Sequence, residues 1–86
     1  IATNTEDQLE ISASVQPNPV DDYLYIQTYG INNFETYIHN LNMQTVHVSE
    51  NQRKIYLGDL PTGLYVLKIK QKYSNDVIMY KIVVQH

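Results

Sequence analysis

Hydrophobic and polar residues alternate along most of this 86-residue chain with the period of two that is typical of a β-strand. Leu24 and Ile26 alternate with tyrosines and a glutamine, and Ile55 and Leu57 alternate with a lysine and a tyrosine. Seven short runs of strand-forming residues follow one another, at residues 11–15, 23–29, 34–41, 44–48, 53–57, 64–72 and 77–84. Turn-forming residues separate them at about the 8 to 12 residue spacing expected of a sandwich, and no window keeps the spacing of an amphipathic helix. The pattern therefore predicts an all-β domain, an antiparallel sandwich of two sheets.

Residues 1–10 are polar and show no period, so we expect a linker there and one folded domain over residues 11–86. A polar segment of this kind is expected to be mobile, and any processing site is expected in it or upstream of it. The chain starts at Ile1 rather than Met, which indicates a segment of a longer polypeptide. The predicted core residues are Ile26, Ile38, Leu57, Leu67, Ile69 and Ile82.

The last two runs predict a hairpin whose inner face contains Tyr65, Leu67 and Ile69. If "SN" or "ND" in the sequence YSNDV forms a two-residue turn, Ile69 pairs with an even-numbered residue. The inner face of the last strand then consists of Ile78, Tyr80, Ile82 and Val84.

The same alternation places Lys68, Lys70 and Lys72 of one strand and Lys81 of the next together on the outer face of this hairpin. Like charges on paired strands repel, so the arrangement calls for a reason. One interpretation is a solvated strand whose lysines block edge-to-edge aggregation. The other is a docking surface for a partner.

The composition limits the chemistry that the domain can perform. With no cysteine, the chain has neither disulfides nor thiolate sites, and its net charge of −3 argues against a dedicated nucleic-acid-binding protein. No apolar run approaches the ~20 residues of a membrane span, and no signal peptide is evident. The four serines have no histidine at motif spacing, and no phosphate-binding glycine loop is present. The sequence therefore predicts a protein that is not an enzyme and that needs no cofactor.

Two pairs of residues have side chains that can bind metal ions. A three-residue loop would set His39 and His47 opposite each other on one face, whereas a two-residue loop would put them on opposite faces. Zinc usually needs three or four ligands, so cross-strand packing is the favoured interpretation. Asp21 and Asp22 have the chemistry of calcium ligands, but a role in capping a turn is favoured for them, and no metal site is predicted.

Two proline-containing segments predict rigid turns. In "QPNPVDD", Pro17 and Pro19 fix the backbone on either side of Asn18 just before a strand. In "LPTGLY", Pro61 is expected to set a turn and Gly63 to supply a positive φ before the next strand begins.

Three pieces in a fixed order, "VQPNPVDDYLYI", "IYLGDLPTGLYVLKI" and the terminal "YKIVVQ", resemble the C-terminal sorting domain of type IX secretion cargo (type A). The residues that match the motifs of that family are Pro17, Asn18 and Pro19, then Leu60, Pro61, Gly63 and Tyr65, and finally Lys81, Ile82 and Val83. The chain departs from the family at Met43, where glycine is common, and at Val84, where a second basic residue is common.

The resemblance implies an Ig-like sandwich that catalyses nothing and serves as an export address. It implies that a cargo domain precedes it, that the pair passes through the periplasm, and that type IX machinery carries the cargo across the outer membrane. A dedicated peptidase usually removes the domain, and the cargo is then released or attached to the cell surface. The expected recognition residues are Lys68, Lys70, Lys81, Ile82 and Val83. The alternative is an Ig-like accessory module that binds carbohydrate or protein at the cell surface, with tyrosines as stacking platforms.

Overall fold

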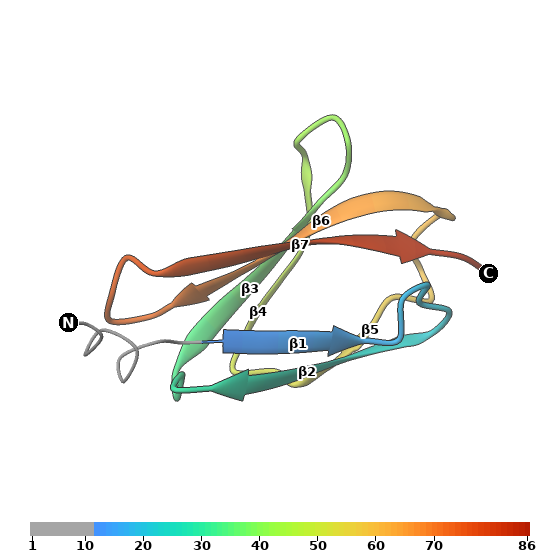
Figure 1. Ribbon diagram of the computed structural model, residues 1–86. Coiled ribbons are helices and arrows are strands. Elements are labelled where there is room, and N and C mark those ends of the chain that lie inside the picture. Colours follow the sequence, from blue (N-terminus) through green and yellow to red (C-terminus); the bar gives the residue numbers. More distant parts are fainter. Residues whose placement is uncertain (1–11) are drawn as a thin grey trace, which may run out of the picture.

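The computed structural model describes residues 12–86, and within that range it contains seven strands and no helix. The strands are β1 (Ser12–Gln16), β2 (Tyr23–Tyr29), β3 (Phe34–His39), β4 (Thr45–Glu50), β5 (Lys54–Tyr56), β6 (Gly63–Gln71) and β7 (Val77–Val84). They form a three-stranded sheet, β1-β2-β5, and a four-stranded sheet, β4-β3-β6-β7, and every pair is antiparallel (Figure 1). The predicted two-sheet antiparallel sandwich is confirmed. The expected linker, residues 1–10, lies outside the described residues.

The core lies between the two sheets, where most inner side chains are aliphatic or aromatic and Thr36 is a buried polar residue. Its buried members are Val20, Leu24, Ile26, Ile31, Phe34, Ile38, Ile55, Leu57, Tyr65, Leu67, Ile69, Ile82 and Val84. All six residues predicted for the core are among them. Burial of one such side chain contributes about 1.5–3 kcal/mol, so these contacts are the main source of stability in a domain without disulfides.

The β6–β7 hairpin has the predicted faces but a longer connection than expected. Ile69 is paired with Ile78, an even-numbered residue as predicted, and Ile78 packs half-buried against the core. The last strand pair is Lys70 with Val77, and the Gln71 N–H donates to the carbonyl of Asp76, so the two-residue turn was wrong. The loop consists of residues 72–75. Because two and four are both even numbers, the longer loop leaves every side chain on its predicted face.

The LPTGLY segment does not contain the positive φ that was expected at Gly63. Among the described residues, positive φ values occur at Gly30 (75°), Met43 (65°) and Asn51 (58°). Gly63 instead begins β6 in ordinary strand geometry, paired with Val84. The chain reverses earlier, where the Leu60 N–H donates to the Leu57 carbonyl at 3.1 Å. A Cβ at position 63 would meet only a Tyr65 ring carbon, at 3.8 Å, which is an ordinary contact.

Met43 occupies the position where the resembled family often has glycine, and its backbone adopts the left-handed conformation that glycine favours. Its amide donates to the carbonyl of Asn40 at 3.0 Å, which closes the β3–β4 turn. The Asn40 side-chain oxygen accepts from the amides of Asn42 and Gln44, at 2.9 and 3.0 Å. These bonds stabilise the turn although position 43 is methionine and not the glycine that this conformation favours.

Candidate functional site

The three motifs that carry the resemblance meet at one end of the sandwich. The Pro17-Asn18-Pro19 segment follows β1, the Leu60–Tyr65 segment leads into β6, and Lys81–Val83 lie in the C-terminal half of β7. Figure 1 shows the loop after β1 and the connection before β6 at the same end as the C-terminus. Val20 forms a parallel bridge with Val84, so segments more than 60 residues apart in sequence are neighbours here.

Asn18 supplies hydrogen bonds that a neighbouring strand would otherwise supply to β7. Its Nδ2 donates to the carbonyl of Lys81 at 3.3 Å, and its Oδ1 accepts from the amide of Val83 at 3.0 Å. Val20 continues the pattern, because its N–H donates to the Val83 carbonyl at 2.7 Å and its carbonyl accepts from Gln85 at 2.8 Å. β7 is an edge strand, and exposed edges pair with other chains. Asn18 and Val20 therefore take up the backbone hydrogen-bonding groups along the C-terminal part of the β7 edge.

The two cis peptide bonds Gln16–Pro17 and Asn18–Pro19 flank the asparagine that makes these contacts. The sequence assigned no chemistry to Asn18. Its partners lie 63 and 65 positions away, and no local pattern reports such a pairing. The only signal was the unusual stiffness that two prolines impose on one polar residue.

Tyr65 explains the spacing of the Leu-Pro-x-Gly-x-Tyr motif. Its ring is buried, and its hydroxyl donates to the carbonyl of Pro61 at 2.6 Å. A tyrosine that bonds backbone a few residues upstream is a recurring device at the corners of β-sandwiches. Leu60 adds a partly buried contact with the core. The motif thus fixes the path of the chain from β5 into β6.

His86 connects the end of the chain to the other two motif segments. Its Nδ1 lies 2.9 Å from a carboxylate oxygen of Asp21, and its Nε2 lies 2.7 Å from the carbonyl oxygen of Leu60. Its backbone amide donates to the hydroxyl of Thr62 at 3.2 Å. Both ring nitrogens face acceptors, so only the doubly protonated ring donates to both. The bonds to Asp21 and to the Leu60 carbonyl raise the pKa of His86 above its ordinary value.

The structure does not support the histidine pair as a metal site. His47 is paired with the buried Ile38 and lies on the inner side of the sheet, whereas His39 is paired with Thr45 and lies on the outer side. A bulge between Ile38 and His39 separates the two registers. The ring of His39 stacks with that of Tyr37, with centroids 6.5 Å apart. The two histidines therefore do not face each other, and His39 stacks on a residue of its own strand.

The aspartate pair has a different role from the turn cap that was favoured for it. Ligand atoms of Asp21, Asp22 and His86 lie within 4.8 Å of one another, and all three residues are exposed. Asp21 uses its carboxylate to accept from His86 rather than from neighbouring backbone. Asp22 contributes its backbone carbonyl, which accepts from the Leu57 amide at 2.6 Å. The ion pair with His86 accounts for the arrangement without a cation.

The lysines of the β6–β7 hairpin lie on the outer face, but they do not face one another. Lys68 is paired with Met79, Lys70 with Val77, and Lys81 with Val66. The expected cross-strand repulsion was therefore wrong, because the β6–β7 register pairs each lysine with an apolar residue of the other strand. Ile82, from the terminal motif, is fully buried. A partner can touch only Lys81 and Val83 of that motif.

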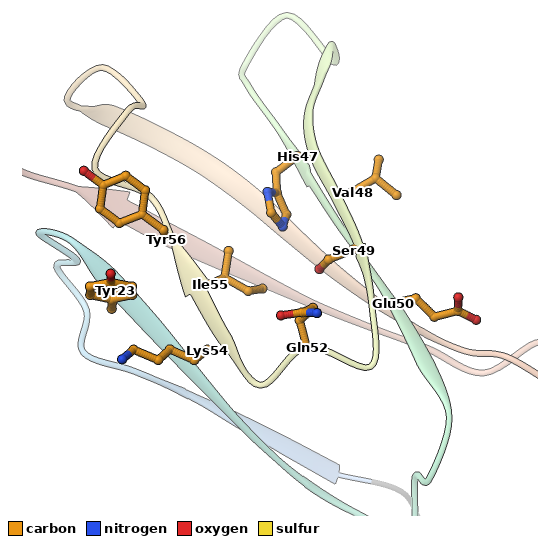
Figure 2. Close-up of a pocket in the computed structure, with 9 residues that line it drawn as sticks. All are labelled: Tyr23, His47, Val48, Ser49, Glu50, Gln52, Lys54, Ile55 and Tyr56. Carbon is orange, nitrogen blue, oxygen red and sulfur yellow. The ribbon is translucent and has the colours of Figure 1, made fainter.

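A groove of about 600 Å³ lies on the opposite side of the sandwich from the β7 edge, between β4 and β5. It is lined by Tyr23, His47, Val48, Ser49, Glu50, Gln52, Lys54, Ile55 and Tyr56. Figure 2 shows His47 and Ser49 directed toward the gap that contains Ile55, while Val48 points away from it. The His47 Nε2 and the Ser49 Oγ are buried and have no hydrogen-bond partner within the described residues. Burial also lowers the pKa of His47. The groove contains none of the ten residues that match the family's motifs, although Tyr23, Ile55 and Tyr56 belong to the longer pieces that carry the resemblance.

The described residues include no helix long and apolar enough to cross a membrane. A search of curated proteins found no match to the chain. The family model described as the secretion system C-terminal sorting domain matches residues 14–85. That range includes the proline corner, the Leu-Pro-x-Gly-x-Tyr segment and the terminal strand, which the fold brings together at one end. The chain therefore belongs to the family of type IX secretion C-terminal sorting domains.

Proposed function

We propose that this domain acts as the folded export address of a longer polypeptide, and that it carries a cargo domain attached at its N-terminal side through the type IX machinery. The observation that supports this is the match of residues 14–85 to the sorting-domain family, with all three motifs gathered in one junction. A junction of that kind presents a defined shape only when the domain has folded. The domain catalyses nothing and requires no cofactor.

We further propose that the cargo crosses the periplasm, that a peptidase then removes the domain, and that the cargo is released or attached to the outer-membrane surface. The cleavage site is placed in residues 1–10 or upstream. The fold supports this position, because β1 pairs along its whole length with β2 and the Tyr80 hydroxyl donates to the carbonyl of Ala13. Cleavage beyond β1 would require removal of a strand that both sheets hold in place.

A reporter fusion tests the proposal. Residues 1–86 are fused behind a reporter that carries its own periplasmic signal, in a bacterium with a type IX system, and the same reporter without the domain is the control. The expected result is reporter in the medium or on the cell surface only when the domain is present. Mass spectrometry of the exported reporter should then locate its C-terminus before residue 11. Retention of the fusion in the periplasm would overturn the proposal, and a C-terminus inside residues 23–84 would overturn the placement of the cleavage site.

The β4–β5 groove favours a second function, the binding of carbohydrate by an accessory module. Tyr23 and Tyr56 stand at the groove with ring centroids 5.2 Å apart, and the groove also contains the unpartnered His47 Nε2 and Ser49 Oγ. Apolar rings beside unsatisfied polar atoms suit a sugar, which has an apolar face and a polar rim. Titration calorimetry of the isolated domain against surface oligosaccharides checks this candidate. Binding that is lost in the Tyr23→Ala variant would support carbohydrate binding. The absence of a heat signal with every oligosaccharide would exclude it.

A further inference from the structure

On the side away from the core, no layer of the described residues covers the four-stranded sheet, and its side chains lie in rows that run across the strands. Strand pairing places four cross-strand rows on this face, which we call the outer face: Glu50-Glu35-Lys70-Val77, Val48-Tyr37-Lys68-Met79, Thr45-His39-Val66-Lys81 and Leu64-Val83. Resting on the proposed sorting function, we propose that this outer face docks an acidic, partly apolar protein surface of the export machinery, with Lys68, Lys70 and Lys81 as its charged contacts.

The positive charges of the chain divide into two groups of three. Arg53 donates to the Thr28 hydroxyl at 2.6 Å, Lys54 lies 4.4 Å from the centre of the Tyr23 ring, and Lys72 forms an ion pair with Glu50. None of these three belongs to the rows of the outer face. The expected place of Lys72 on that face was wrong, because β6 ends at Gln71 and Lys72 lies in the β6–β7 loop. Each of them already has a partner in the folded domain.

Lys68, Lys70 and Lys81 form the second group. Within residues 12–86, no carboxylate oxygen lies within 4.0 Å of any of their amino groups. Glu35 is the cross-strand neighbour of Lys70, but its carboxylate accepts from the Tyr37 hydroxyl at 3.0 Å. Lys68 lies 5.7 Å from the centre of the Tyr37 ring, farther than the 4.4 Å between Lys54 and Tyr23, so its neighbour is a ring and not a counter-charge. Half of the positive charge of an acidic protein is therefore gathered on one face without a counter-charge in contact.

Apolar side chains separate these lysines and remain exposed. The exposed fraction is 62% for Met79, 58% for Val48 and 42% for Val77. Each of them shares a row with Lys68 or Lys70. Exposed methionine and valine beside the lysines provide apolar area that a partner can bury. A partner that covers this apolar area lowers the free energy of the complex, whereas the lysines fix the orientation of that partner.

The charges of the outer face favour a protein partner over an anionic membrane. Glu35 and Glu50 lie in the same row as Lys70, at the β3–β4 side of the face. An anionic bilayer would press negative charge against Glu35, and against Glu50, which Lys72 alone neutralises, whereas a protein surface can place an opposite charge against each group. The size of the face indicates a transient complex. The four strands have six, six, nine and eight residues and give a flat area of roughly 460 Å², well below the ≈ 800 Å² per partner of a stable complex.

Two triple variants with the same change in charge test the proposal in the reporter fusion. The first is Lys68→Gln, Lys70→Gln and Lys81→Gln, which spares the buried residues of β6 and β7. The matched control is Arg53→Gln, Lys54→Gln and Lys72→Gln, which removes the three charges that already have partners. A third variant replaces Lys68, Lys70 and Lys81 with arginine and keeps the charge of the face. The melting temperature of each purified domain and the export rate of each fusion are measured.

The expected result is a fall in export of at least tenfold for the first variant, with its melting temperature within a few degrees of the parent. Export should be near normal for the matched control and for the arginine variant. Equal export of the first variant and the parent would overturn the docking surface, and an equal fall in both glutamine variants would reduce it to an effect of net charge. Export of the parent fusion shows that sorting itself works, so failure of the parent is distinguishable from failure of the surface. Vesicles of anionic lipid provide the last measurement, and binding of the parent but not of the first variant would replace the protein partner with a membrane.

Discussion

Replacement of Asn18 by alanine tests whether the proline corner exists to close the edge of β7. The change removes the bond from Nδ2 to the Lys81 carbonyl and the bond from the Val83 amide to Oδ1. It keeps both prolines, the strand pairing and the buried side chains. Any loss of stability therefore reports the two side-chain bonds alone.

The expected magnitude follows from the geometry of the two bonds. A typical intramolecular hydrogen bond contributes about 0.5–1.5 kcal/mol, so two bonds set an upper limit of about 3 kcal/mol. Asn18 is exposed, one of its bonds is long at 3.3 Å, and water can reach the groups that it leaves. The loss should therefore be near the lower limit, about 1 kcal/mol, which corresponds to a fall of about 4–8 °C in melting temperature for a domain of this size.

Urea denaturation measures this loss as a lower midpoint with an unchanged slope. Asn18→Asp is the matched control, because its oxygen can still accept from Val83 while the ionised carboxylate faces the Lys81 carbonyl. Protonation at low pH restores an O–H donor to this aspartate, so its deficit relative to the parent should shrink as the pH falls. A loss below about 0.3 kcal/mol in Asn18→Ala, with no pH dependence in Asn18→Asp, would refute the edge-closing role.

Three further changes are expected to have distinct results. Ile69→Ala should lower the free energy of unfolding by about 2–5 kcal/mol because Ile69 is fully buried, and a loss under about 0.5 kcal/mol in urea melts would contradict its placement. Met43→Gly should stabilise the domain by about 0.5–1 kcal/mol, because it relieves a left-handed backbone at an exposed side chain while giving back part of the gain as unfolded-chain entropy. Destabilisation in the same melts would count against it. The pKa of His86 is raised by Asp21 and the Leu60 carbonyl, so its contribution to stability should be complete below the unfolded value near 6.5 and should disappear as the pH rises through the folded value. The stability difference between the parent and His86→Gln, measured from pH 5 to 9, should therefore shrink with rising pH, and a difference independent of pH would exclude the ion pair.

The fold was predictable because its main signal is local. The alternation at Leu24 and Ile26, or at Leu67 and Ile69, depends only on residues two positions apart, and it defined the buried face of each strand. All seven predicted runs became strands, with boundaries within two residues of the expected ones. Turn lengths were harder, since the β6–β7 loop is set by bonds such as the one from the Asp76 amide to the Ser74 hydroxyl. A period of two fixes the parity of such a loop but not its length.

The site was less predictable because its contacts are distant in sequence. Asn18 and Lys81 have no common pattern that periodicity can detect. Gly63 was assigned a positive φ because glycine often supplies one, yet here it begins a strand beside Val84. The lysines were placed on the correct face by parity, but their alternation with Val77 and Met79 needed the register of two paired strands. The sequence identified the motif residues, and the fold showed that the three motifs lie together at one end of the sandwich.

The closure of β7 by Asn18 and Val20 joins the two ends of the domain in one structural element. Contacts across more than 60 residues form only after the intervening chain has been made, and such contacts slow folding. A chain truncated before Lys81 therefore has no partner for Asn18, and a fully synthesised but unfolded chain has both groups apart. A receptor that required this junction would accept neither. The junction therefore forms only in a chain that extends to β7 and has folded. The same few hydrogen bonds also cover the edge of the sheet.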